Sequence, residues 1–363
     1  MGKLLFFKFL DLLFGLLSLI PAMMAVIGCF VSRIHPTRYP AIHWLGLLLP
    51  LLLLLNFVIM LFWIWRKSIW MVIPLAALLL SIPYISSVFH WPVRTPDPPN
   101  NKITVATYNI RNDDGMNIHL NGSMFAGFIK DEAIDILCLQ EFPGSDDARK
   151  GLIDLFVPIL PYFQIHSHTP GGMSVALFSR YPILDMHPVI FTDVTDNSAM
   201  WVDLDLQGER VRVFNNHLQT TNLNQNKVRF SFDVNQTLSQ IKTLKQVIEE
   251  NGSIRTRQAD IIRTLLDESP YPLIVCGDFN TSTASYTYRT IKGKLRDSFR
   301  DVGKGYGYSY RYMKRLYRID FVFYSPGAFR ATRYYSPELQ FSDHKPVVVT
   351  FDFTPGVHSE KGK

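Results

Sequence analysis

Residues 273–280 read LIVCGDFN, a run of four apolar side chains followed by a glycine, an aspartate, a phenylalanine and an asparagine. A short apolar run that ends in turn residues predicts a buried strand, with Asp278 and Asn280 at its end. The same arrangement recurs at residues 136–141 (ILCLQE), where Glu141 ends the run. Because a rigid sheet can hold several side chains around one cleft, polar residues at strand ends are candidate functional groups.

Similar apolar runs continue through the last two thirds of the chain. Two stretches, residues 235–250 and 257–268, have apolar residues at helical spacing, and this segment also carries Arg255 and Arg257. The alternation of strands and helices predicts one α/β domain over residues 101–355, followed by a polar tail at residues 356–363. The other predicted strands are residues 103–108, 173–178, 211–214, 320–324 and 347–353.

The first 91 residues have a different composition. Residues 12–32, 39–65 and 68–91 carry no formal charge, and each stretch is long enough for the roughly 20 apolar residues of a membrane-spanning helix. Three such runs would leave a soluble helical hairpin too little polar surface, and the first run is longer than the core of a signal peptide. The sequence therefore predicts about three transmembrane helices in residues 1–91, followed by an extended Pro-rich linker at residues 92–100.

The charge balance follows the same division. The chain carries a net charge of +6, but residues 1–91 hold six basic residues and one acidic residue, so the remainder is almost neutral. The basic balance is therefore no evidence that the whole α/β domain binds nucleic acid. If the N-terminus is cytoplasmic, three spans place four basic residues inside (Lys3, Lys8, Arg66 and Lys67) and three outside (Arg33, Arg38 and Arg94). This excess of positive charge inside favours the α/β domain on the non-cytoplasmic side. Three cysteines exclude a disulfide scaffold.

The polar residues at the strand ends are mostly carboxylates, amides and imidazoles. Carboxylates with asparagine suit a hard ion such as Mg²⁺ or Mn²⁺, and histidines beside them suit phosphate binding and proton transfer. This mixture predicts metal-assisted hydrolysis at phosphorus. The chain has no phosphate-binding Gly-rich loop ending in Lys-Ser/Thr and no Gly-x-Ser-x-Gly elbow, which argues against a P-loop NTPase or a serine hydrolase.

Seven motifs in order carry a family resemblance over residues 101–353. The motifs are TYNIR (107–111), LCLQE (137–141), GGMSVALFSRYPI (171–183), NNHLQ (215–219), VCGDFN (275–280), YRIDFVF (317–323) and SDHKPV (342–347). With these motifs the chain resembles the endonuclease/exonuclease/phosphatase (DNase I-like) superfamily, as a membrane-anchored member. The resemblance implies a four-layer αββα sandwich of two mostly antiparallel sheets and a hydrolase acting on phosphoric ester bonds.

The resemblance also implies a metal site. Glu141 would be the principal ligand of Mg²⁺ or Mn²⁺, Asn109 would support the metal or the phosphate, and Asp343 would help to complete the site. The resemblance leaves open whether the site holds one metal ion or two.

Five further residues match the family's catalytic positions. Asp278 would orient or deprotonate water, or bind a second metal, and Asn280 would hold that aspartate and a phosphate oxygen. His344 would contact the phosphate, with Asp320 fixing its tautomer. His217 would be the second imidazole, and the sequence identifies no partner that orients it.

A basic and aromatic segment bears on the substrate. Residues 289–318 hold ten basic residues, two acidic residues and five interleaved tyrosines. Phosphate contacts and base stacking would suit nucleic acid, with Tyr310, Arg311 and Arg318 as candidate substrate-binding residues. Arg255 and Arg257 could also reach phosphate, or could lie in a solvated helix start. The chemistry of the basic segment suits an anionic lipid headgroup as well, or a loop that faces anionic lipid without touching substrate.

Two classes of function therefore stay in view. The first is a nuclease-like phosphodiesterase, with a phospholipase C/sphingomyelinase-like or inositol-phosphate phosphatase-like hydrolase as the alternative. The second is a catalytically inactive, membrane-tethered binding domain, and the presence of Glu141, Asp278 and His344 favours the enzyme. A transporter is a weaker interpretation, because the only acidic residue in the apolar segments is Asp11 near an end. The bilayer is the one partner indicated by the N-terminal segments, and no obligate protein partner is evident.

Overall fold

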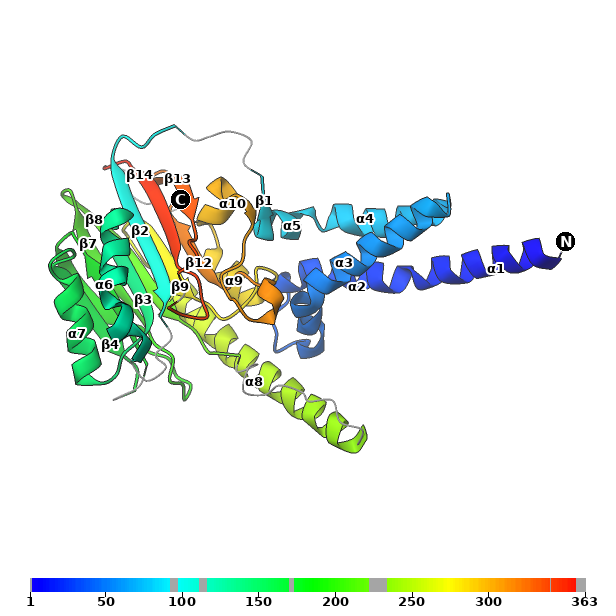
Figure 1. Ribbon diagram of the computed structural model, residues 1–363, viewed down its shortest axis with the longest axis horizontal. Coiled ribbons are helices and arrows are strands. Elements are labelled where there is room, and N and C mark those ends of the chain that lie inside the picture. The colour runs from blue at the N-terminus through cyan, green and yellow to red at the C-terminus, as the bar shows by residue number, and fades with distance from the viewer. Residues whose placement is uncertain are drawn as a thin grey trace. The chain divides into compact units, whose positions relative to one another are not determined.

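Two six-stranded sheets face each other in the region that follows the apolar segments (Figure 1). The computed structural model describes residues 2–91, 97–110, 116–169, 173–221, 234–339 and 341–356. Residues 92–96 of the predicted linker and residues 357–363 of the predicted tail lie outside the described residues. The sheets confirm the predicted αββα sandwich.

The first sheet has the strand order β13-β14-β2-β3-β5-β4. Its neighbours are antiparallel except for β2 and β3, which run parallel. The bounds are β2 (Lys102–Asn109), β3 (Ile136–Phe142), β4 (Tyr162–Ser167), β5 (Ser174–Ser179), β13 (Phe329–Tyr335) and β14 (Val347–Phe353).

The second sheet has the strand order β10-β12-β9-β8-β7-β6. Again one pair is parallel, β8 with β9, and the others are antiparallel. The bounds are β6 (Ile183–Pro188), β7 (Ala199–Leu206), β8 (Glu209–His217), β9 (Leu273–Asp278), β10 (Arg296–Asp297) and β12 (Asp320–Tyr324). A separate pair joins β1 (Phe89–His90) to β11 (Gly305–Tyr306).

The apolar residues of the strands fill two core layers. One layer lies between the sheets and includes Val105, Val202 and Ile274, all fully buried. The other lies under α6 (Met116–Asp131) and α7 (Asp146–Phe156), which cover the outer face of the first sheet (Figure 1). The predicted strands are the central ones, because burial on both faces requires the continuous apolar runs seen in the sequence.

One 34-residue helix, α8 (Val234–Asp267), joins the two helical stretches that the sequence analysis separates. Its buried residues include Ala259 and Ile262, but also the polar Asn251, Arg255 and Gln258. Polar residues on the inner face interrupt the apolar periodicity, which is why the pattern breaks although the helix continues. The remaining helices of this region are α9 (Tyr286–Lys292), α10 (Ser298–Val302) and the 3₁₀ turn η4 (Met313–Arg315).

The chain divides into two units, Met1–Ser87 with Ser282–Arg289, and Val88–Thr281 with Thr290–Lys363. This division differs from the boundaries predicted from sequence, at residues 91, 100 and 355, which stay predictions. In the first unit, the segments Phe6–Arg33 and Pro40–Trp65 are long and apolar enough to cross a membrane. A third span results if the pair Ile69–Leu80 and Ile82–Val88, bent by 55°, counts as one.

Helix α3 provides the interior polar contacts of this unit. Asn56 Nδ2 donates to the Pro21 carbonyl at 3.0 Å, and Trp63 Nε1 donates to Ser18 Oγ at 3.0 Å. Such bonds satisfy polar groups inside a helix bundle. The helices are α1 (Gly2–Leu17), α2 (Leu19–Phe30), α3 (His43–Trp65), α4 (Val72–Leu80) and α5 (Ile82–Val88), with the 3₁₀ turns η1 (Val31–Arg33), η2 (Pro40–Ile42) and η3 (Ile69–Met71).

Candidate active site

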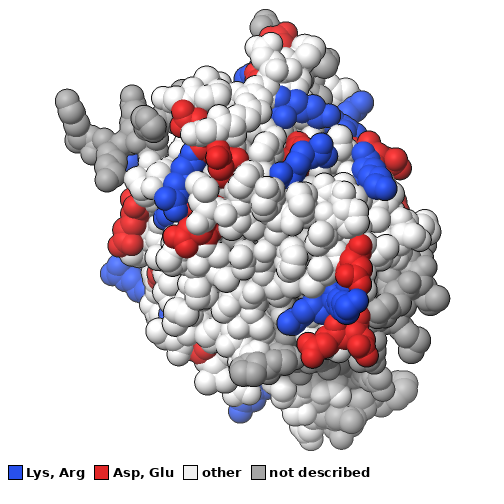
Figure 2. Space-filling model, turned by 90° about the vertical axis from the view of Figure 1, so that its left-hand side faces the viewer, with Lys and Arg blue, Asp and Glu red and all other residues white. Residues whose placement is uncertain are grey.

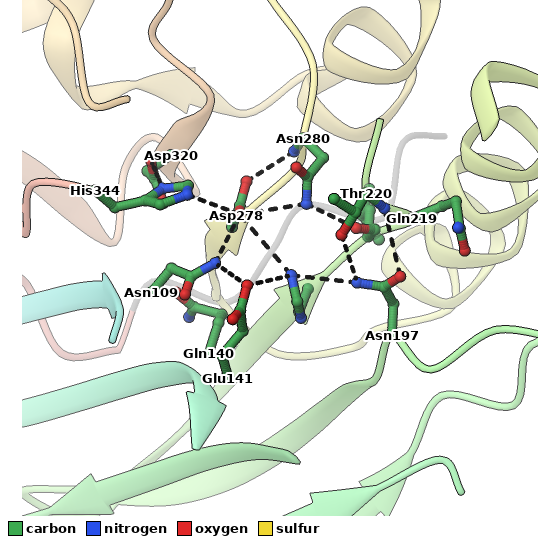
Figure 3. A network of polar contacts seen from close by, with 12 residues as sticks. Asn109, Gln140, Glu141, Asn197, Gln219, Thr220, Asp278, Asn280, Asp320 and His344 are labelled. Atoms are coloured by element: carbon green, nitrogen blue, oxygen red, sulfur yellow. Dashed lines mark hydrogen bonds and ion pairs between the residues drawn. The ribbon is translucent and has the colours of Figure 1, made fainter. Parts of the chain in front are cut away.

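The two parallel strand pairs deliver polar side chains to one edge of the sandwich. Asn109 ends β2 and Glu141 lies near the end of β3, while His217 and Asp278 end the paired strands β8 and β9. Parallel neighbours end on the same side of a sheet, so each pair presents two functional groups together. Asn109 Nδ2 donates to Glu141 Oε1 and to Asp278 Oδ2, both at 3.0 Å, and thereby links the two sheets (Figure 3).

A β-bulge aims Glu141 at this edge. The register of β3 against β5 shifts between Leu139 and Phe142, so an extra residue is inserted on β3. Glu141 has a φ of +52°, in the left-handed region that residues with a side chain rarely adopt. Bulges and strained backbone are common where a strand redirects a functional side chain.

Asp278 is held from two directions by Asn280. The Asn280 backbone amide donates to Asp278 Oδ1 at 2.8 Å, and its Nδ2 donates to Oδ2 at 3.2 Å. Asn280 also has positive φ, at +51°. Burial raises the pKa of Asp278 to about 6, against the opposing charge of His344. The predicted pairing of these two residues is therefore present, with a carboxylate poised to exchange a proton near neutral pH.

His344 and Asp320 form a buried hydrogen-bonded pair. Their Nδ1 and Oδ2 atoms are 2.9 Å apart, and His344 Nε2 lies 3.7 Å from Asp278 Oδ2. Burial alone would lower the pKa of His344, but the carboxylates of Asp320, Asp278 and Asp343 outweigh it and raise that pKa to about 10. The charges of these three carboxylates thus favour the protonated imidazole of His344.

His217 is the second imidazole and is equally buried. Its Nε2 lies 3.6 Å from Glu141 Oε1 and 3.9 Å from Asp278 Oδ2. Burial lowers the pKa of His217, although the charge of Asp278 opposes this. The pKa values of the two imidazoles are thus shifted in opposite directions, a pattern typical of sites that separate acid from base roles.

Asn197 is the orienting residue that the sequence analysis does not find. Its Nδ2 lies 3.2 Å from His217 Nε2, and its Oδ1 accepts from Thr220 N and Thr195 Oγ1 (Figure 3). Asn197 lies two residues before the start of β7, so it too flanks a strand. Its position next to a strand could have marked Asn197 as a candidate, but the residues around it (DNSA, 196–199) match none of the seven motifs.

Three of the predicted site residues, Tyr310, Arg311 and Asp343, lie on the loops beside His344. Tyr310 pairs with His344 through the backbone, and the two ring centroids are 5.1 Å apart. Arg311 donates its backbone amide to the Asp343 carbonyl at 2.8 Å, and its guanidinium bonds the carbonyls of Ser342 and His344. Arg311 thus fixes the loop that carries Asp343 and His344.

Arg318 points into the protein rather than to a substrate. Only 1% of the residue is exposed, and its Nη2 donates to Asp297 Oδ2 at 2.6 Å. Its guanidinium lies 4.7 Å from the ring centroids of both Phe299 and Phe321. Arg318 therefore supports the strand that begins at Asp320, and we do not retain it as a substrate-binding residue.

Arg255 and Arg257 are also engaged within the protein. Arg255 is buried and donates to the Gln219 carbonyl at 2.6 Å, and Arg257 forms an ion pair with Asp193. Neither matches a solvated helix start, and Arg255 links α8 to the segment that follows His217.

The oxygen-rich side of the cluster fits a hard divalent ion. Asp278, Asp320 and His344 offer ligand atoms within 4.8 Å of one another. His344 would ligate a metal only as a neutral imidazole, so a cation would compete there with the proton. Asp278 shares the other side of the cluster with Glu141 and Asn109, whose carboxylate and amide oxygens are the donors that Mg²⁺ and Mn²⁺ prefer. A cation there would also stabilise the buried carboxylate of Asp278.

The sequence profile of the Endonuclease/Exonuclease/phosphatase family matches residues 106–344. The chain belongs to this family. Members of the family are hydrolases that act on phosphoester bonds, and the match spans every predicted site residue. A second profile, Domain of unknown function (DUF8431), matches residues 8–88. No curated protein matches the chain.

Solved structures share the family fold at low sequence identity. The endonuclease/exonuclease/phosphatase from Beutenbergia cavernae is 19% identical with a TM-score of 0.51, and the match covers 70% of this chain and 72% of that one. Truncated Caenorhabditis elegans TDP2 is 17% identical with a TM-score of 0.51, covering 71% and 100%. D. rerio TDP2, in complex with a single-strand DNA product, is 14% identical with a TM-score of 0.50, covering 69% and 99%.

Proposed function

We propose that this family member is a membrane-anchored, divalent-metal-dependent phosphodiesterase. The observation that carries the proposal is the convergence of Glu141, His217, Asp278 and His344, from four strands or their ends, on one edge of the sandwich. A binding domain without activity would not need two imidazoles with pKa values shifted in opposite directions around a carboxylate of raised pKa.

Glu141 and Asn109 would hold the metal, with Asp343 and Asp278 beside them. When bound, Mg²⁺ or Mn²⁺ would neutralise phosphate oxygens and lower the pKa of a ligated water. Asn109 contributes through its carbonyl oxygen, because its amide nitrogen already bridges Glu141 and Asp278.

The remaining residues divide the proton and charge chemistry. Asp278, fixed by Asn280, orients the attacking water and accepts its proton. His344, kept charged by Asp320, donates to a phosphoryl oxygen and offsets the charge that develops there. His217, kept in place by Asn197, approaches the phosphoryl group from the side of Glu141.

Nucleic acid is the substrate class that we favour. Beside His344, Tyr310 and Tyr312 form an edge-to-face pair with ring centroids 5.7 Å apart, and Tyr312 is 44% exposed. The exposed Lys314 and Arg315 follow at once, in a turn where both have positive φ. An aromatic surface with adjacent cations suits an unpaired base and its phosphates. D. rerio TDP2 was solved with a single-strand DNA product.

The basic character is local. On the face shown in Figure 2, Lys and Arg side chains lie beside Asp and Glu side chains over a mostly uncharged surface. That face therefore offers no broad cationic field for a nucleic-acid backbone, and we place recognition at the Tyr310–Arg315 segment.

A lipid headgroup is the second candidate, and the apolar N-terminal helices favour it. Two or three spans in the same chain keep the α/β unit close to a bilayer, where phosphodiester lipids are abundant. With the N-terminus in the cytoplasm and three spans, the α/β unit would lie on the non-cytoplasmic side.

A substrate panel tests the proposal. The purified full-length chain is assayed on plasmid DNA, single-stranded DNA, RNA, sphingomyelin, phosphatidylinositol phosphates and a phosphomonoester, with Mg²⁺ or EDTA. We expect Mg²⁺-dependent cleavage of single-stranded nucleic acid that Glu141→Gln abolishes. Cleavage of lipid alone would select the second candidate, and no Mg²⁺-dependent cleavage of any substrate would leave a binding domain.

A further inference from the structure

We propose that Gln140 and Asn215 are positioning residues, an amide pair across the two sheets that fixes the bulge carrying Glu141. The role rests on the proposed function, since it acts on the metal ligand. Both side chains are fully buried between the sheets, and neither is needed by the mechanism above.

Asn215 supplies hydrogen bonds where the bulge interrupts the first sheet. The regular pairing of β3 with β5 ends at Leu139 opposite Ala176 and resumes at Phe142 opposite Ser174. Asn215, from the facing strand β8, donates Nδ2 to the carbonyls of Leu139 at 3.1 Å and Ala176 at 2.9 Å. One side chain of the second sheet therefore binds the last regular pair before the bulge.

Gln140 completes the pair from the first sheet. Its Nε2 donates to Asn215 Oδ1 at 2.6 Å and to Thr107 Oγ1 at 3.0 Å, and its backbone carbonyl accepts from the Ile110 amide at 3.0 Å. A buried amide without these partners would be strongly unfavourable, so the two side chains fix each other's positions.

The pair lies next to both halves of the site in the chain. Gln140 immediately precedes Glu141, whose φ of +52° needs support from its surroundings, and Asn215 lies two residues before His217 on β8. The geometry thus joins the strand of Glu141 to the strand of His217. Loss of the pair should let Glu141 relax and should weaken metal binding, beyond any effect on folding.

The experiment compares Asn215→Leu and the milder Gln140→Met with Leu204→Ala in the detergent-solubilised full-length chain. Leu204 is fully buried in the same inter-sheet core on β7, so its truncation gives a matched loss of stability. Mn²⁺ binding is followed by the electron paramagnetic resonance signal of the free ion, and hydrogen–deuterium exchange is followed in the peptide 136–142.

We expect both amide variants to weaken Mn²⁺ binding by about tenfold or more and to accelerate exchange in peptide 136–142. Leu204→Ala should do neither, even at an equal loss of thermal midpoint. The double variant Gln140→Met/Asn215→Leu also removes the donor to the Leu139 and Ala176 carbonyls, so it should regain no Mn²⁺ affinity.

Unchanged exchange in peptide 136–142, or equal Mn²⁺ loss in Leu204→Ala, would overturn the positioning role. Failure of the proposed function has a different signature: the wild-type chain would bind no Mn²⁺, while the amide variants would still accelerate exchange at the bulge. If exchange also stayed unchanged there, both proposals would fail.

Discussion

Glu141 and Asn280 perform their roles from backbone conformations that side-chain-bearing residues rarely adopt. Each such conformation costs on the order of 1–3 kcal/mol and persists only when its surroundings hold it. At Glu141 these are the bulge and the cross-sheet amides, and at Asn280 the bonds to Asp278 and the Leu218 carbonyl. The sequence motifs identify these two residues as candidates, but they do not predict the backbone conformation of either one. Asn197 and the role of Asn215 stayed hidden for a related reason, because both act through partners distant in sequence.

Glu141→Gln should lower Mg²⁺-dependent hydrolysis of bis(p-nitrophenyl) phosphate by about 100-fold or more, since it removes a charged metal ligand. Initial rates over a Mg²⁺ titration measure this. The control is Glu132→Gln, which removes a surface carboxylate that pairs with Arg333. A Glu141→Gln rate close to that of this control would exclude Glu141 from the metal site.

His344→Ala should reduce kcat by roughly 10²- to 10⁴-fold, and Asp320→Asn should reduce it less, because Asp320 acts through the imidazole. The two residues work as one unit, so the double variant should be no slower than His344→Ala alone. Steady-state kinetics of the three variants decide the matter. Fully multiplicative losses would show that Asp320 acts independently of His344.

At the scale of strands and helices, burial decides what the sequence reveals. The central strands β2, β3, β9, β12 and β14 are buried on both faces and read as apolar runs. The edge strand β4 is only half-buried, and its sequence YFQIHS carries polar residues that mask it. The motif regions could therefore be placed on strand ends from the sequence, whereas the sheet edges and the continuity of α8 needed the structure.

Gly277→Ala should destabilise the fold by more than about 2 kcal/mol, because an added Cβ would lie 1.9 Å from the Asn216 carbonyl oxygen at a φ of +132°. The matched control is Gly208→Ala, where φ is +90° but nothing lies within 4 Å. Strain alone should cost that variant about 1 kcal/mol. Thermal unfolding of both variants measures the difference, and equal losses would refute the steric explanation.

The ion pairs of Glu338, in the loop after β13, predict that the stability of the fold falls in acid. Glu338 accepts from Tyr308 and pairs with Lys345 and Arg311, and these contacts lower its pKa to about 2. The folded-state pKa thus lies below the unfolded value of about 4.3. The carboxylate therefore contributes stability that is present above about pH 4.3 and is lost as the pH falls toward 2.

Glu338→Gln should lower the thermal midpoint slightly at pH 7, with a gap to wild type that closes between about pH 4.3 and 2. Unfolding scans of both proteins across this range provide the measurement. A gap that widens on acidification would contradict the sign of the shift.

The whole chain combines an apolar N-terminal unit with an α/β unit of almost balanced charge. Composition alone predicts this division, because apolar stretches without charges are visible without any structure. The number of spans is less readily predicted, since the third stretch bends by 55° between α4 and α5.

Reporter fusions test the topology in a bacterial host. If the chain makes three spans with its N-terminus in the cytoplasm, an alkaline phosphatase fused to the C-terminus should be active and a green fluorescent protein should be dark. The reverse pair of signals would place the α/β unit in the cytoplasm. A fusion after residue 67, between the second and third spans, serves as the internal control.

Each sheet contains a single parallel pair, and it is this pair that ends at the site. Parallel neighbours cannot be joined by a tight hairpin, so the chain must leave the catalytic edge and return by a long excursion. The spacing of the catalytic side chains therefore does not depend on the length of these connections. Insertions between His217 and β9 can reshape what approaches the phosphoryl group while the strand ends keep their spacing, so new specificities can arise here without rebuilding the sheets.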